Sequence, residues 1–204
     1  MARILPLERE EFDPMLLRLT AGVPEEELGH LRIFARAPQT AAAWIGFLRA
    51  LHAARTLPPR LIEVVRLRIA YHNQCPHCMA IRIADGVADG VTEELVCSLE
   101  APADTPDLTE AEQSALRYAD LMATNHKSID EGTFDDLRRH FTEPEIVELG
   151  VQIAVFVGFG RLGSGWRLTD DIPDRYAEAE LGELHFAADS VRIGAVSDAG
   201  AGVG

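Results

Sequence analysis

The sequence lacks the basic clusters of a nucleic-acid-binding protein. It has a single lysine, Lys127, among nineteen basic residues, and its formal charge is -14 at pH 7. Phosphate recognition needs grouped Lys and Arg side chains, and a surface of this charge repels a polyanion. We therefore expect no nucleic-acid partner.

Targeting and membrane signals are also missing. The first residues interrupt their apolar run at Pro6 and continue with acids, which a secretory signal peptide does not do. The longest apolar run, residues 149–160, is about half of the roughly 20 residues that span a bilayer. It predicts a buried core helix, and we expect a cytoplasmic protein that binds no membrane.

Cysteine is scarce, with only Cys75, Cys78 and Cys97 in the chain. Three cysteines at this spacing cannot form a disulfide scaffold, and in a reducing compartment the close pair indicates a catalytic or metal-binding role. Cys97 follows Leu95 and Val96, and this setting predicts a buried helical position where the thiol packs as a small hydrophobe.

Alternating β-branched runs bounded by hairpin turns are nearly absent, whereas helix-start signals are frequent, so the sequence predicts an all-α fold. The segment after Pro58 and Pro59 is apolar on most faces and predicts a buried central helix. Other helices are predicted from Pro24 to about residue 35, from Pro38 to 55, from Gln74 to 84, from Thr92, and from the capping pairs Thr109–Glu112, Thr133–Asp136 (weaker) and Thr142–Glu145.

The pattern divides the chain into an N-terminal helical extension (1–34), a helical domain (35–172) and a C-terminal tail (173–204). The small-residue end, 195–204, is expected to be disordered and without a catalytic role. A shift of 85 residues aligns Pro59–Glu63 with Pro144–Glu148 and places two glycines, 160 and 163, opposite the cysteine pair. This match indicates an internally duplicated helical unit or arises by chance.

The chemistry is expected at Cys75-Pro76-His77-Cys78, at the start of a predicted helix. Unpaired backbone N–H groups and the helix dipole favour a thiolate there, which lowers a thiol pKa from about 8.5. One cysteine then becomes a nucleophile and the other closes an intramolecular disulfide. His77 and the nearby His72 are candidate proton carriers near neutral pH.

Glu63 precedes Cys75 by twelve residues and lies in the apolar central segment. A carboxylate in such surroundings is either paired or has a raised pKa suited to proton transfer. The pairing alternative would use Arg66 or Arg60.

The cysteine pair has three rival interpretations. A zinc site needs four ligands and would have to recruit His72, His77 or Cys97. A thioredoxin-like motif needs a βαβ setting, which a helical chain does not offer. In the third interpretation, the cysteines are incidental core residues without a chemical role.

The combination of Glu63, eleven intervening residues, Cys75, two more residues and Cys78 resembles the carboxymuconolactone decarboxylase and alkyl hydroperoxidase D-like family over about residues 35–170. This resemblance implies an all-α fold in trimers or hexamers and an antioxidant thiol peroxidase activity without a cofactor or a metal. It also implies that Cys78 attacks a small hydroperoxide, Cys75 resolves the product and Glu63 begins a proton relay. Electrons would come from a dithiol such as a lipoyl-bearing protein.

One position departs from the family pattern. The relay histidine that the resemblance implies, four residues after the second cysteine, is Arg82 here. An arginine cannot act as a base, although its charge would lower the pKa of a thiol one turn away. His77 or His72 is then the candidate substitute.

Two other functions remain as alternatives. The first is a lyase that acts on a small lactone in an apolar pocket, where the thiols are incidental. The second is a non-catalytic oligomeric binding protein that lost the relay with Arg82.

Overall fold

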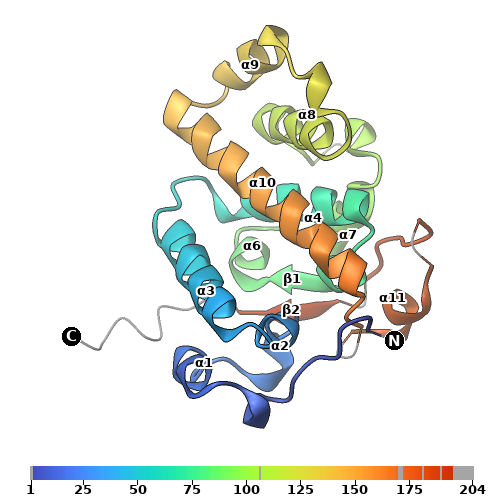
Figure 1. Ribbon diagram of the computed structural model, residues 1–204. Coiled ribbons are helices and arrows are strands. Elements are labelled where there is room, and N and C mark those ends of the chain that lie inside the picture. Colours follow the sequence, from blue (N-terminus) through green and yellow to red (C-terminus); the bar gives the residue numbers. More distant parts are fainter. Residues whose placement is uncertain (1, 106, 170–171, 181, 189, 195–204) are drawn as a thin grey trace.

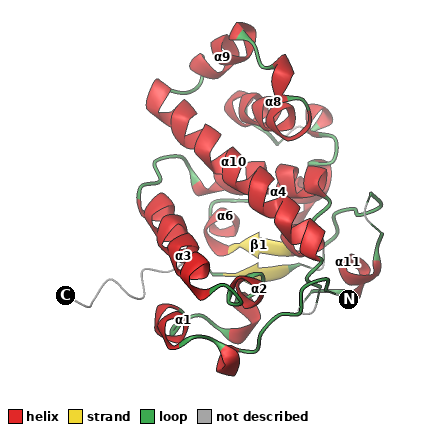
Figure 2. Ribbon diagram, in the orientation of Figure 1, coloured by secondary structure: helices red, strands yellow, loops and turns green. Residues whose placement is uncertain are grey.

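The computed structural model describes residues 2–105, 107–169, 172–180, 182–188 and 190–194. Helices make up most of this part, as Figure 1 and Figure 2 show, and the all-α prediction is confirmed apart from one pair of three-residue strands. The predicted disordered end, 195–204, lies outside the described residues.

Helix α4 (Pro59–Asn73) is the centre of the fold and packs against α8 (Glu110–Thr124) and α10 (Glu143–Trp166), which crosses it in Figure 1. Its residues are buried on most faces, as the apolar pattern predicted. The predicted capping boxes begin α8 and α10: Thr109 N–H donates to Glu112 at 2.9 Å and Thr142 N–H to Glu145 at 2.7 Å.

The weaker capping prediction, Thr133–Asp136, is wrong. Asp130 caps α9 (Glu131–Arg138), and Thr133 is the third residue of that helix. Asp136 instead accepts hydrogen bonds from Ser114 and Arg117, so its carboxylate connects α9 to α8.

The predicted helix from Pro24 to residue 35 is broken into η2 (Glu25–Glu27) and α2 (Leu31–Phe34). The break falls at Gly29, whose φ of +43° belongs to the left-handed region that glycine tolerates. Helices α1 (Pro14–Leu19) and α2 pack on α3 (Pro38–Ala53), the next predicted helix. Their small core consists of Phe12, Leu16, Leu28, Ala35, Ala41 and Ile45.

The predicted helix from Gln74 to residue 84 is correct only over Pro76–Ala80. Gln74 ends α4 in the left-handed conformation, and α5 (Pro76–Ala80) gives way to strand β1 (Ile81–Ile83) and then α6 (Ala84–Ala88). The Arg66 guanidinium donates to the carbonyls of Cys78 and Ile81, so these groups are satisfied without a continued helix. Strand β1 pairs in parallel with β2 (Val191–Ile193), which ties the C-terminal segment to the domain.

Helix α10 is less buried than its composition predicted. Val147 is 65% exposed, and Val151 and Leu162 are also exposed. By length and composition alone α10 would reach across a membrane, yet it packs against α4, α5, α8 and α9. The remaining elements are η1 (Arg9–Glu11), α7 (Glu93–Ser98), η3 (Pro102–Asp104), η4 (His126–Ser128) and α11 (Asp174–Glu178).

Candidate redox site

Cys75 and Cys78 are joined by a disulfide at the start of α5. Cys75 is the N-cap of this helix, and its Sγ accepts a hydrogen bond from the Cys78 N–H at 3.3 Å. Cys75 is fully buried, whereas Cys78 is partly exposed. A small molecule therefore reaches Cys78 first.

Cys78 lies on the wall of a cavity of about 230 Å³, which we call the thiol cavity. Trp44 and Phe159 stack on this wall with ring centroids 3.5 Å apart, and Phe34 meets Trp166 edge-on at 5.1 Å. Aromatic side chains line ligand pockets because they offer large apolar contact areas. The surroundings of Cys78 thus favour an organic substrate.

Glu63 forms a two-point ion pair with Arg66, and the Nε–Oε2 and Nη2–Oε1 distances are 2.6 and 2.8 Å. The Ile83 N–H donates to the same carboxylate at 2.9 Å. The pairing prediction for Glu63 is thus confirmed with Arg66, while Arg60 pairs with Glu112. The role of Glu63 at the start of a proton relay stays a prediction.

The pair also holds the cysteine helix in place. Arg66 donates to Cys78 O at 2.8 Å and to Ile81 O at 2.9 Å, so one guanidinium connects α4 to both ends of the turn that carries Cys78. Gly86 of α6 covers Glu63 from the other side, where a Cβ on this glycine would lie 2.5 Å from the Glu63 Cβ. Gly86 was predicted to stop a helix, but it lies within α6 and packs closely against Glu63.

His72 hydrogen bonds with Asp120 at 2.6 Å, and Arg68 pairs with the same carboxylate. Burial raises the pKa of Asp120, but the hydrogen bonds from His72 and Arg68 outweigh it and hold this pKa below its ordinary value. Arg82 is 1% exposed, donates to Met79 O at 2.6 Å and pairs with Glu93 at 3.0 Å. A relay role for His72 and a thiolate-tuning role for Arg82 stay predictions.

The structure brings a second imidazole to the site, one that the sequence did not indicate. His30 meets the buried His77 edge-on, with ring centroids 4.6 Å apart, and both line the thiol cavity. A Cβ on Gly163 would lie 2.6 Å from His30 Nε2 and 3.1 Å from Cys75 Sγ, so these two atoms face the same small space.

Both imidazoles are neutral at pH 7. Burial lowers the pKa of His30 to about 4, against a smaller upward effect of the Gly163 backbone. Burial also lowers the pKa of His77 well below its ordinary value, and the neighbouring His30 and Arg66 add to this effect. A neutral imidazole has one unprotonated ring nitrogen, which can accept a hydrogen bond from a thiol.

Cys97 does not belong to the site, and its predicted burial is wrong. Leu95, Val96 and Leu99 face the core, which leaves Cys97 exposed on α7. Partial desolvation and the Glu93 carboxylate raise the pKa of this thiol, so it is a poor nucleophile. Within the described ranges, no three or more His, Cys, Asp or Glu side chains gather as a metal site.

These features define an all-helical protein with a CxxC disulfide held by a buried Glu–Arg pair. Residues 38–121, from α3 into α8, match the carboxymuconolactone decarboxylase family. The resemblance that the sequence indicated is confirmed over this segment.

Uncharacterized proteins from two Mycobacterium tuberculosis strains, CDC 1551 and H37Rv, are each 33% identical to this chain over 116 residues. These alignments cover 56% of the chain and 40% of each relative, so the chain spans less than half the length of these curated relatives.

Solved structures share the fold at low identity. The apo debrominase Bmp8 superposes with a TM-score of 0.69 at 20% identity, covering 86% of this chain and 96% of that one. An alkylhydroperoxidase AhpD core from Ralstonia eutropha gives 0.64 at 16% identity, over 86% and 94%. A protein of unknown function from Agrobacterium tumefaciens gives 0.58 at 24% identity, over 69% and 97%. The fold is therefore AhpD-like.

Proposed function

We propose that this protein is a thiol-dependent peroxidase or disulfide oxidoreductase that acts on small organic hydroperoxides. The observation that carries the proposal is the Cys75–Cys78 disulfide, of which only Cys78 reaches the thiol cavity. The buried Cys75 is then the resolving thiol.

In the proposed cycle the Cys78 thiolate attacks the terminal peroxide oxygen. The O–O bond breaks and the terminal OH is transferred to Cys78, which becomes a sulfenic acid. The alkoxide takes up the proton that the Cys78 thiol lost and leaves as the alcohol. The Cys75 sulfur then attacks the Cys78 sulfur, and hydroxide leaves and takes the Cys75 proton to form water. An external dithiol, such as that of a lipoyl-bearing protein, reduces the disulfide and is itself oxidised.

His77 is the proposed proton carrier in place of the histidine that Arg82 replaces. His77 lies between the two cysteines in the sequence. Its ring contacts His30, whose Nε2 faces the same space as Cys75 Sγ. We include His30 as a second carrier for the Cys75 proton. Glu63 also lines a cavity of about 210 Å³, which would give its carboxylate access to water as the start of a relay.

Single-cysteine variants test the redox proposal. Purified Cys78→Ala and Cys75→Ala should lose oxidation of dihydrolipoamide driven by cumene hydroperoxide, whereas Cys97→Ala should keep it, because that thiol is not part of the disulfide. Full turnover by Cys78→Ala would overturn the proposal.

A second candidate is a reaction on a flat ring substrate, a class that includes the lactone lyase alternative. Its support is the stacked pair Trp44 and Phe159 on the cavity wall. A cysteine-to-alanine variant of the debrominase Bmp8, similar in fold with a TM-score of 0.63, has been solved in complex with 2,3,4-tribromopyrrole. Turnover of an unsaturated lactone that survives loss of both thiols would favour the lyase, and Trp44→Ala should then abolish it.

A further inference from the structure

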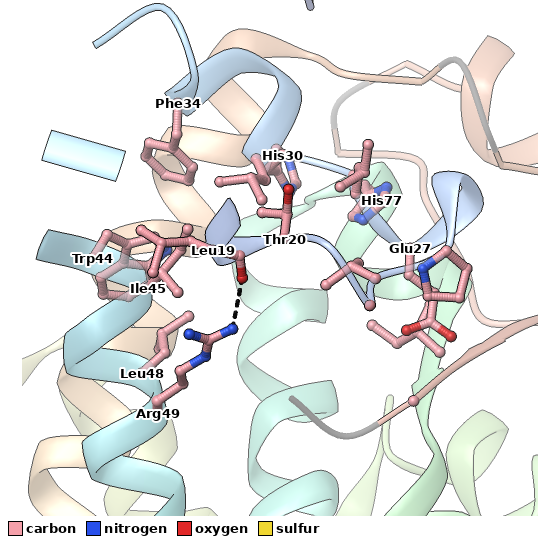
Figure 3. Close-up of a pocket in the computed structure, with 18 residues that line it drawn as sticks. Leu19, Thr20, Glu27, His30, Phe34, Trp44, Ile45, Leu48, Arg49 and His77 are labelled. Atoms are coloured by element: carbon pink, nitrogen blue, oxygen red, sulfur yellow. Dashed lines mark hydrogen bonds between the residues drawn. The ribbon is translucent and has the colours of Figure 1, made fainter. Parts of the chain in front are cut away.

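A larger cavity lies beside the thiol cavity. It has a volume of about 390 Å³ and is enclosed by residues 19–31, one side of α3 and the end of β2; we call it the N-terminal cavity (Figure 3). Most of its wall comes from outside residues 38–121, the segment that matches the family. It is therefore a feature of this chain rather than of the matched segment.

One charged side chain of its wall has a nitrogen atom without a hydrogen-bond partner. Of the three buried side-chain nitrogen atoms that lack such a partner in the described part of the chain, Arg49 Nε belongs to a residue of this wall. His30 Nε2 is another, but it faces Gly163 and Cys75 Sγ. Buried polar groups are normally paired, so each unpaired one calls for an explanation. A ligand with hydrogen-bond acceptors would provide one.

The Arg49 guanidinium indicates that this ligand is negatively charged. Its Nη2 donates to Leu19 O at 2.7 Å, the dashed contact in Figure 3, and among the described residues no carboxylate pairs with this guanidinium. A guanidinium binds a carboxylate through parallel hydrogen bonds. Glu27 lies on another part of the wall, away from Arg49 in Figure 3, and would repel a second negative charge.

The rest of the wall is apolar. Leu28, Ile45 and Leu48 lie on it beside Trp44. The volume falls in the range of about 300–1,000 Å³ that small-molecule pockets have. The ligand would therefore have one acidic group on an apolar body.

We propose that the N-terminal cavity binds a small apolar monocarboxylate, such as a medium-chain fatty acid or an aromatic acid, with its carboxylate at Arg49. The bound molecule would contact His30 and His77, which also line the thiol cavity. The site is separate from the disulfide, so the inference does not depend on the redox proposal.

Calorimetric titration of the full chain with decanoate tests the site. We expect saturable binding of one decanoate per chain, at least tenfold weaker binding by Arg49→Gln, and unchanged binding by Arg18→Gln, a control whose arginine is exposed on α1. Arg49→Lys should keep much of the affinity because it keeps the charge, which covers the case in which Arg49→Gln does not fold. Decanol, with the same apolar body and no charge, should bind at least tenfold more weakly.

Two further variants separate this site from the redox centre. Leu48→Trp should block decanoate by filling the cavity, and the double variant Cys75→Ala/Cys78→Ala should bind it as the parent does. Absence of saturable binding, equal affinity for decanol and decanoate, or loss of binding in the double cysteine variant would overturn the inference.

Discussion

Arg66 connects the two parts of the candidate site at the scale of single residues. It neutralises Glu63 and donates to the carbonyls of Cys78 and Ile81. The Glu63 side chain is 2% exposed and that of Arg66 is 11% exposed. Because water hardly reaches either group, each charge is stabilised mainly by the other.

Replacing Arg66 should destabilise the fold strongly. Arg66→Met leaves the Glu63 carboxylate buried without its partner and should lower the free energy of unfolding by about 3–5 kcal/mol. The double variant Glu63→Gln/Arg66→Met should recover part of this loss, because it removes the unpaired charge. Urea unfolding measures both effects, and losses that simply add would contradict the pairing.

The two buried histidines predict a pH dependence of stability. In the unfolded chain each titrates near 6.5, whereas the folded pKa of His30 is about 4 and that of His77 is also lowered. Between pH 6.5 and 4 the unfolded chain binds more protons than the folded one. The free energy of unfolding should therefore decrease as the pH is lowered through this window, by up to about 1.4 kcal/mol per pH unit for each histidine. In urea unfolding at a series of pH values, His30→Phe should flatten this slope, and the exposed His126→Gln should not.

Part of the site was predictable from single residues and part was not. Glu63 and the cysteine pair were found because a carboxylate in an apolar run and a CxxC are unusual locally. His30 was missed because it reaches the thiol cavity only through the turn at Gly29 and the packing of α2 on α3, which are tertiary features.

At the scale of elements, alanine substitutions of two glycines in α10 test how closely this helix approaches the site. Gly163→Ala would place a methyl group against His30 and Cys75, so it should cost about 1–3 kcal/mol of stability and slow disulfide re-formation. Gly158→Ala meets no atom within 4 Å among the described residues and should stabilise α10 by about 0.5–1 kcal/mol. Thermal unfolding and thiol titration after reduction compare the two, and equal behaviour would contradict the close approach.

The same scale shows why some elements were predicted correctly. The boxes at Thr109 and Thr142 depend on residues three apart, so local sequence specifies them. The end of α5 depends on Arg66, and the pairing of β1 depends on β2, which is distant in the sequence, so local patterns gave no sign of either.

For the whole molecule, the exposed apolar residues of α10 and α3 support the homo-oligomer that the family resemblance implies. Val147 and Val151 are one turn apart on α10, and Phe47 of α3 is 44% exposed. Light scattering should show a trimer or a hexamer, and Val147→Asp/Val151→Asp should reduce it to smaller species, because charges disfavour burial in an interface. A monomeric parent protein would contradict this expectation.

The central claim, that Cys75 and Cys78 form a working redox pair, is tested most directly by mass spectrometry of the reduced protein after one equivalent of cumene hydroperoxide. The account predicts rapid formation of the Cys75–Cys78 disulfide while Cys97, whose thiol pKa is raised, stays reduced. It also predicts a sulfenic acid at Cys78 in Cys75→Ala. Oxidation of Cys97 as fast as of the pair, or an unreacted pair, would contradict it.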